Sequence, residues 1–119
     1  MHWTLDKNRP ICPQLCQQLC VRIVAGVYTP GQRIPSVREL ALEAGVNPNT
    51  VQKTFEELER QKVLYSVRGA GWYVSEDIAP ARQLRTSLVD QTMEEFFRQM
   101  TALGFSLEET KKMVKEWQL

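Results

Sequence analysis

Residues 45–59, "GVNPNTVQKTFEELE", are the most informative part of this 119-residue chain about its fold. It opens with polar side chains that suit the first turn of a helix, because Asn47 can cap the helix while Pro48 occupies its first position. Apolar residues then recur at spacings of three and four, which predicts a helix with one buried face. The residues of that face are Val51, Phe55 and Leu58.

A second helix is predicted immediately upstream of this stretch. Its start is marked by a capping box, in which Ser36 and Glu39 satisfy each other's backbone donors. Gly45 supplies a conformationally permissive residue just past its end, and we expect Leu40 and Ala41 to face the core. Two helices joined by so short a glycine-containing turn indicate a helix-turn-helix.

Flanking segments complete a winged helix-turn-helix. Residues 13–25 form an amphipathic helix, and Pro30-Gly31 predicts a turn before a short extended piece. Residues 63–76, "VLYSVRGAGWYVSE", place two β-type runs around the glycine-rich sequence 68–71, which is typical of a hairpin. The apolar face of the first helix consists of Leu15, Leu19 and Ile23.

A C-terminal tail follows a polar, proline-containing exit, and we place the domain boundary near Asp77. Residues 1–77 are then the winged domain, and residues 78–119 form a tail of two helices. The first tail helix is long, amphipathic and ended by Gly104, and the second opens with a capping box at Ser106. The predicted fold is mainly α with a small β-hairpin. Four apolar residues of the tail are expected to mediate dimerisation: Leu84, Leu88, Phe96 and Met100.

Composition excludes several function classes. The net charge is only +1, with nine basic and eight acidic residues before the boundary and six of each after it, so any affinity for nucleic acid must be local. The sequence has no Ser/His/Asp set, no phosphate loop and no cluster of metal-ligating residues, which argues against an enzyme and against a cofactor. No segment resembles a signal peptide or a membrane span, so we expect a cytoplasmic protein without a membrane partner.

The first turn of the third helix carries the side chains that suit a DNA major groove. Asn49 and Gln52 can both donate to and accept from a base edge or a phosphate, Thr50 offers a hydroxyl and a methyl group, and Lys53 adds a charge. The alternative is that Asn47, Asn49 and Thr50 are only helix-start residues, which capping favours regardless of function.

Three arginines form a predicted cationic rim around that turn. Arg38 lies in the first turn of the preceding helix, Arg33 precedes it, and Arg68 stands at the hairpin tip beside Gly69. An arginine at such a tip suits the narrow, electronegative minor groove. Solvated surface arginines and an ordinary tight turn would produce the same pattern.

Three cysteines recur every fourth residue of the first helix. Cys12, Cys16 and Cys20 would line one stripe, without the geometry of a disulfide, and are read as reduced thiols. They could serve as a thiol or metal sensor. The interpretation we favour is that they are small apolar packing residues, because the usual spacing of a structural zinc site is missing.

The motifs "GQRIPSVRELA", "GVNPNTVQKTFEELE" and "VRGAGWYV", in this order, resemble the winged domain of the GntR family of bacterial transcription regulators. The short two-helix tail and the sequence "NPNTV" are similar to those of the YtrA subfamily. The resemblance implies DNA contacts at the family's positions, although relatives often have arginine or serine where this chain has Pro48. With the rim residues, the predicted DNA-binding set is Arg33, Ser36, Arg38, Asn47, Pro48, Asn49, Thr50, Gln52, Lys53, Arg68 and Gly69.

The resemblance also implies a mode of action. It implies a homodimer, dimerised through the tail helices, that binds a pseudo-palindromic double-stranded DNA operator, most simply as a repressor, and that controls an ABC-transporter operon. A small-molecule effector is compatible with the sequence but is not identified by it. A winged helix used only as a protein-interaction module remains an alternative, because the near-zero net charge permits it.

Overall fold

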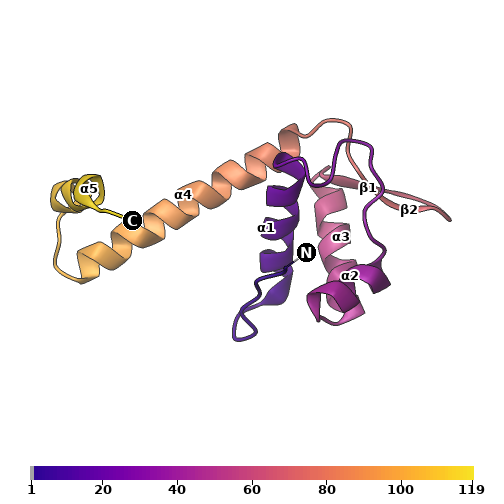
Figure 1. Cartoon of the computed structure of the whole chain (residues 1–119), viewed down its shortest axis with the longest axis horizontal. Helices are drawn as coiled ribbons and strands as arrows, with labels where there is room; N and C mark the ends of the chain where they lie inside the picture. Colours follow the sequence, from indigo (N-terminus) through magenta and orange to yellow (C-terminus); the bar gives the residue numbers. More distant parts are fainter. Residues whose placement is uncertain (1) are drawn as a thin grey trace. The chain divides into compact units, whose positions relative to one another are not determined.

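The computed structural model describes residues 2–119, in which helices and one antiparallel hairpin follow each other along the chain (Figure 1). The fold is mainly helical, as predicted. The structure divides into two compact units, the first ending at Arg85 and the second comprising Thr86–Leu119. None of the helices it describes has the length and apolar character that crossing a membrane requires. The elements are α1 (Ile11–Val24), α2 (Val37–Ala44), α3 (Pro48–Arg60), β1 (Leu64–Val67), β2 (Gly71–Val74), α4 (Ala79–Ala102) and α5 (Leu107–Glu116).

The helix-turn-helix is built by the local signals that the sequence contains. Both halves of the predicted capping box at Ser36 and Glu39 are present at the start of α2. Gly45 ends α2 in the left-handed conformation at φ 69°, which costs a glycine little. Asn47 then caps α3, with Pro48 in its first turn. The prediction of a helix-turn-helix over this region is confirmed.

Three helices of the first unit, α1, α2 and α3, end in the same backbone motif, in which two N–H groups fold back onto the last turn. At the end of α1, Gly26 is left-handed at φ 83° and the Val27 N–H donates to the Arg22 carbonyl at 2.9 Å. At the end of α3 the left-handed residue is Lys62, at φ 65°, and the Val63 N–H donates to the Leu58 carbonyl at 2.8 Å. Lys62 thus adopts a conformation that L-residues with a Cβ rarely take.

The start of α1 differs from the prediction. The helix begins at Ile11 instead of Pro13, after Pro10, which provides no side-chain cap. Pro13 is accommodated inside the first turn because its missing N–H would have no helical partner there. The sequence pattern placed the start at the proline, and the structure moves it two residues earlier.

The wing is a hairpin with an additional extended segment along β2. β1 and β2 pair in register from Leu64 opposite Val74 to Val67 opposite Gly71. On the other side of β2, the Ile34 N–H donates to the Trp72 carbonyl at 2.9 Å and the Val74 N–H donates to the Gln32 carbonyl at 2.9 Å. The segment that follows the Pro30-Gly31 turn therefore lies along the outer edge of β2 and forms an isolated β-bridge with it at Arg33.

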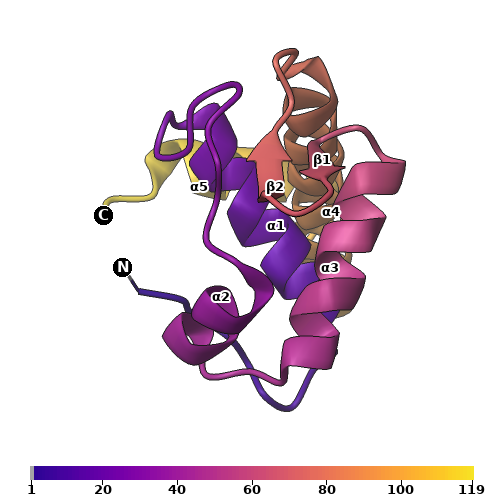
Figure 2. The ribbon, with the colours of Figure 1, turned by 90° about the vertical axis from the view of Figure 1, so that its right-hand side faces the viewer.

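The core of the first unit lies where α1 crosses α3, beneath the hairpin (Figure 2). Every apolar residue predicted for the three helix faces is buried, including Phe55, whose ring contacts Trp72 at a centroid distance of 5.4 Å. Ala81, at the start of α4, is also buried in this core, although the sequence placed it in the tail. The buried helix-face residues are Leu15, Leu19, Ile23, Leu40, Ala41, Val51, Phe55 and Leu58.

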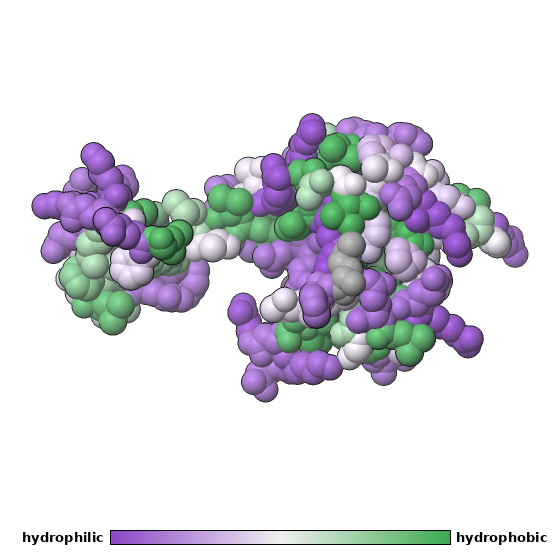
Figure 3. Space-filling model, in the orientation of Figure 1, coloured by the Kyte–Doolittle hydropathy of each residue, from purple (hydrophilic) through white to green (hydrophobic). Residues whose placement is uncertain are grey.

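The second unit, described by itself, consists of most of α4 together with α5. Gly104 ends α4 at φ 99°, and the predicted capping box of Ser106 and Glu109 opens α5. Hydrophobic residues gather on the visible surface of this part of the chain (Figure 3). They surround a largely apolar cavity of about 600 Å³. Its lining consists of Phe96, Met100, Leu103, Phe105, Met113, Val114, Trp117 and Leu119.

Candidate nucleic-acid interface

From Pro48 to Val51, the backbone of α3 has no N–H group left for a ligand. Pro48 has none to offer. The Asn49 N–H donates to the Asn47 side-chain oxygen at 2.8 Å, and the N–H groups of Thr50 and Val51 donate to the Asn47 carbonyl at 3.0 and 3.3 Å. A helix N-terminus that binds a phosphate does so through free backbone N–H groups. Any contact of this turn with a phosphate or a base would therefore have to come from its side chains.

The side chains of this first turn are available for that task. Asn49, Gln52 and Lys53 are exposed, and Thr50 is half-buried at the edge of the helix. Within residues 2–119 none of the four side chains has a hydrogen-bond or ion-pair partner. Positions 49, 52 and 53 are three and four residues apart, so they share one face of α3. A duplex lying along this face would meet an amide, a second amide and an ammonium group.

Arg38 presents a free guanidinium from the first turn of α2. Its side chain is exposed and has no partner in the described part of the chain. Nearby Ser36 is occupied: its hydroxyl accepts a hydrogen bond from the Glu39 N–H at 3.1 Å, and its own N–H donates to the Glu39 carboxylate at 3.1 Å. Hydrogen bonding of the Glu39 carboxyl, first to the Ser36 N–H and second to the Ser36 side chain, and then the charge of Arg33 lower the pKa of that carboxyl. The structure thus gives Ser36 a capping role.

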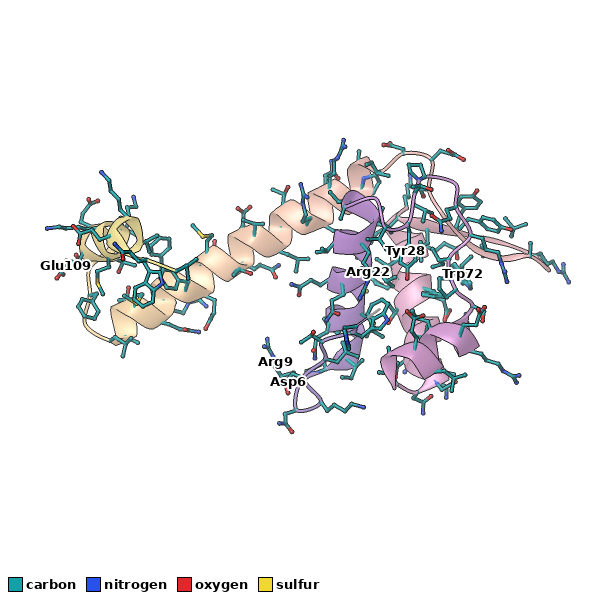
Figure 4. The ribbon with its side chains drawn as sticks, viewed as in Figure 1. Asp6, Arg9, Arg22, Tyr28, Trp72 and Glu109 are labelled. Carbon is teal, nitrogen blue, oxygen red and sulfur yellow. The ribbon has the colours of Figure 1, made fainter. Side chains whose placement is uncertain are left out.

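The hairpin tip presents Arg68 next to Gly69. Arg68 is exposed and also lacks a partner among residues 2–119. Gly69 is left-handed at φ 80°, and a Cβ placed there would meet no atom within 4 Å. The tip is therefore open on its outer side. Trp72, from the strand that follows, extends the other way, onto α3 (Figure 4).

Arg33, the third arginine of the predicted rim, is engaged within the protein. Its Nε–H donates to the Ala70 carbonyl at 2.8 Å. The residues of the predicted DNA-binding set therefore fall into three groups. Arg33, Ser36 and Asn47 make hydrogen bonds within the protein, and Pro48 and Gly69 have no polar side chain. We use the term recognition surface for the six residues with free polar side chains, which are Arg38, Asn49, Thr50, Gln52, Lys53 and Arg68.

The acidic residues of α3 lie beyond the recognition surface, in its second half. Glu57 pairs with Arg60 one turn later, and Gln61 donates to the other Glu57 oxygen at 2.8 Å. Glu59 accepts from the N–H and hydroxyl of Ser66 at 3.0 and 2.8 Å, which joins α3 to β1. Two of the carboxylates that would repel phosphates are thus occupied within the domain.

The cysteine stripe lies on the inner side of α1. Cys20 is buried and Cys12 and Cys16 are half-buried, and all three are free thiols. The hydroxyl of Thr54, a buried residue that the sequence pattern did not identify, donates to the Thr50 carbonyl at 2.8 Å and lies 3.3 Å from the Cys12 sulfur. Burial, and next the neighbouring Cys12, raises the pKa of Cys16 to about 12, and burial raises that of Cys20 to about 11. Across residues 2–119, no group of three or more candidate ligands is placed to hold a metal ion.

Comparison with known proteins places this geometry among DNA-binding regulators. The sequence profile described as "Bacterial regulatory proteins, gntR family" matches residues 13–74, which contain α1, the helix-turn-helix and the hairpin. The HTH-type transcriptional repressor YtrA of Bacillus subtilis (strain 168) is 37% identical over 116 residues, and the match covers 92% of this chain and 85% of YtrA.

Solved structures agree with this assignment. A GntR family transcriptional regulator from Listeria monocytogenes is 37% identical with a TM-score of 0.82, over 96% of this chain and 100% of that one. AraR(DBD), solved in complex with operator ORE1, is 31% identical with a TM-score of 0.54, over 63% of this chain and 94% of that one. The comparisons give no support to a pure protein-interaction module or to a thiol or metal sensor.

Proposed function

Because this chain belongs to the GntR family of bacterial regulatory proteins and is a DNA-binding transcription regulator, not an enzyme, we propose that it acts as a homodimer on a pseudo-palindromic operator. The observation that carries the proposal is the recognition surface. Six polar side chains of the helix-turn-helix and wing have no partner in the described chain and stand on elements that are capped and packed.

On the duplex, each element has a separate task. The first turn of α3 enters the major groove, where Asn49, Thr50 and Gln52 contact base edges. Arg38 reaches a guanine edge or a phosphate from the start of α2, and Lys53 contacts the phosphate backbone. The wing tip follows the backbone to the minor groove and inserts Arg68.

A dimer formed through the second unit would have the twofold symmetry that a pseudo-palindromic operator requires. The unit leaves large apolar side chains exposed, among them Met93, Leu103 and Trp117, besides the partly exposed Phe96. Exposed apolar patches of this kind mark association surfaces, and a second copy of the chain has the matching chemistry. Met100 and Leu88 belong to the same proposed surface. Leu84 packs partly against the core of the first unit, so it has less surface to offer to a dimer than the other three.

The regulatory role rests on similarity to the YtrA subfamily. We propose repression, with a cytoplasmic protein that controls an ABC-transporter operon. Transcription of the adjacent operon should rise when the gene is deleted. A fall in transcription would mean that the protein activates.

Selection of bound duplexes from a random DNA pool tests the proposal directly. We expect enrichment of two half-sites related by twofold symmetry and separated by about one helical turn. Enrichment of one unpaired half-site would contradict the homodimer while leaving DNA recognition intact. Retention of duplexes without sequence enrichment or salt dependence would contradict operator binding itself.

A further inference from the structure

We infer that Arg33 is a positioning residue, which holds the wing tip in the conformation that presents Arg68, and that DNA is not its main partner. The inference rests on the proposed insertion of the wing into the minor groove. It changes the role that the sequence suggested for Arg33, from a cationic contact on the rim of the interface to a link between the segment bridged to β2 and the tip.

The guanidinium of Arg33 lies against the backbone of the tip. Its Nε–H donates to the Ala70 carbonyl at 2.8 Å, across a sequence separation of 37 residues. A Cβ at Gly71 would lie only 3.0 Å from the same nitrogen, closer than side chains normally approach. Gly71 is therefore the residue that leaves room for the guanidinium, in addition to adopting a φ of 116°.

The base of the Arg33 side chain is fixed independently of the tip. Arg33 stands opposite Tyr73 in an isolated β-bridge, between the two hydrogen bonds that join Gln32 and Ile34 to β2. The side chain can therefore hold Ala70 in a fixed position relative to the sheet. A charge-assisted hydrogen bond from an anchored arginine restrains a loop more strongly than a neutral bond does.

The tip has little else to order it. Within the hairpin, the Ala70 N–H donates to the Val67 carbonyl at 2.9 Å. From outside the hairpin, no hydrogen bond other than that of Arg33 reaches residues 68–70 in the part of the chain that the structure describes. A loop with two left-handed glycines loses much conformational freedom when it is immobilised on DNA. Arg33 would reduce this loss by ordering the tip before binding.

Amide hydrogen exchange in the free protein tests the link without DNA. The Ala70 N–H reports opening of the tip, and the Leu40 N–H, bonded to the Ser36 carbonyl at 2.9 Å, reports the helix-turn-helix. In Arg33→Ala, exchange at Ala70 should become roughly tenfold faster while exchange at Leu40 is unchanged. Arg68→Ala is the matched control, because it removes a tip arginine without this bond, and Ala70 should then exchange at the wild-type rate. Unchanged exchange at Ala70 in Arg33→Ala would overturn the inference.

A double-mutant cycle on the duplex selected by the wild-type protein tests the consequence for binding. Arg33→Ala should weaken binding about tenfold in the wild type but not in an Arg68→Ala background, because the link acts through Arg68. In a Lys53→Ala background the full loss should persist. Additive losses for Arg33 and Arg68, with a salt slope reduced by about one for Arg33→Ala, would overturn the inference and make Arg33 a phosphate contact. If the wild-type protein enriched no duplex, the proposed function would fail, and exchange at Ala70 would still decide whether Arg33 orders the tip.

Discussion

Arg38 and Lys53 both present exposed positive charges, yet their side chains suit different parts of a duplex. The planar guanidinium of Arg38 can pair with two acceptors of a guanine edge, whereas the ammonium of Lys53 is a flexible point charge. Both side chains are free of partners within residues 2–119, so truncating either leaves no broken contact in the protein. Substituting the two residues one at a time therefore distinguishes a contact that reads the base sequence from one that contributes only charge.

Replacing Arg38 by alanine should reduce specific binding. We expect a loss of roughly 1–3 kcal/mol on the operator and weaker discrimination at one base pair per half-site. Titration of operator and scrambled duplexes measures both quantities. Equal losses on the two duplexes would mean that Arg38 only anchors the backbone, and base reading would then rest on Asn49, Thr50 and Gln52.

Lys53→Ala is the matched charge control. It should weaken operator and scrambled duplexes alike and reduce the salt slope by about one per protomer, as expected for one lost phosphate contact. Binding measured over a salt series checks this. A loss confined to the operator would instead place Lys53 at a base edge.

Two thiols of α1, those of Cys16 and Cys20, should be unreactive in the folded protein. The pKa values of Cys16 and Cys20, raised to about 12 and about 11, leave very little thiolate at neutral pH. Alkylation of these two residues at pH 7.5, followed by mass spectrometry, should be roughly a hundredfold slower than in urea, where their pKa values return to the ordinary range. Rapid alkylation that released DNA would revive the thiol-sensor hypothesis.

At the scale of elements, the ends of the helices were partly predictable. Glycine at the end of α2 and capping boxes at Ser36 and Ser106 are local patterns, because each motif lies within a few adjacent residues. The left-handed Lys62 was not predictable, since lysine carries no such signal and tertiary packing of the hairpin on α3 imposes the turn. The bond from Arg33 to Ala70 was hidden for the same reason, because it joins distant segments.

Lys62→Gly should stabilise the first unit. The substitution removes the cost of a left-handed lysine, and we expect a gain of roughly 0.5–1 kcal/mol in the free energy of unfolding. Gly26→Ala is the reciprocal control at the end of α1, where a Cβ would meet no atom within 4 Å, so its destabilisation reports backbone conformation alone. Urea denaturation measures the free energy of unfolding of both variants. A lower value for Lys62→Gly than for the wild type would contradict the strain at this position.

The capping box of α2 should make stability depend on pH. Hydrogen bonds with Ser36 lower the pKa of Glu39 in the folded state, so its carboxylate stabilises the fold above its ordinary pKa, and this contribution is lost as the pH falls through the lowered value. Glu39→Gln should therefore be less stable than the wild type at pH 7 and equal to it in acid. Thermal unfolding across this pH range checks the convergence, and a difference that persists in acid would point to a steric effect of the substitution.

At the scale of the whole molecule, the two units divide within α4, eight residues beyond the boundary that the sequence placed near Asp77. The composition change at residue 77 marks the end of the wing, but it does not reveal that Ala81 and Leu84 pack on the core of the first unit. Burial of this kind depends on where the chain turns after the wing. The order of the elements, in contrast, followed from periodicity and capping signals alone.

Truncation should distinguish the boundary at Asp77 from the boundary at Arg85. A chain ending at Arg85 should fold like the full protein, sediment as a monomer and bind the operator much more weakly, because it lacks the proposed dimer surface. A chain ending at Asp77 should in addition lose roughly 2 kcal/mol of stability, since it exposes the core that Ala81 and Leu84 cover. Sedimentation equilibrium and urea denaturation measure both effects, and a dimeric 1–85 fragment would move the dimer interface to the first unit.

The backbone at the start of α3 has a consequence for how such a regulator acquires new targets. Asn47 and Pro48 complete the capping of the helix by themselves, so Asn49 and Gln52 contribute no hydrogen bond from their side chains to the fold. Under the proposed contacts of these two side chains with base edges, we expect substitutions at the two positions to change the preferred operator at little cost in stability. After gene duplication, two copies could therefore diverge in target through a few changes in one helical turn, while the scaffold that presents that turn stays the same.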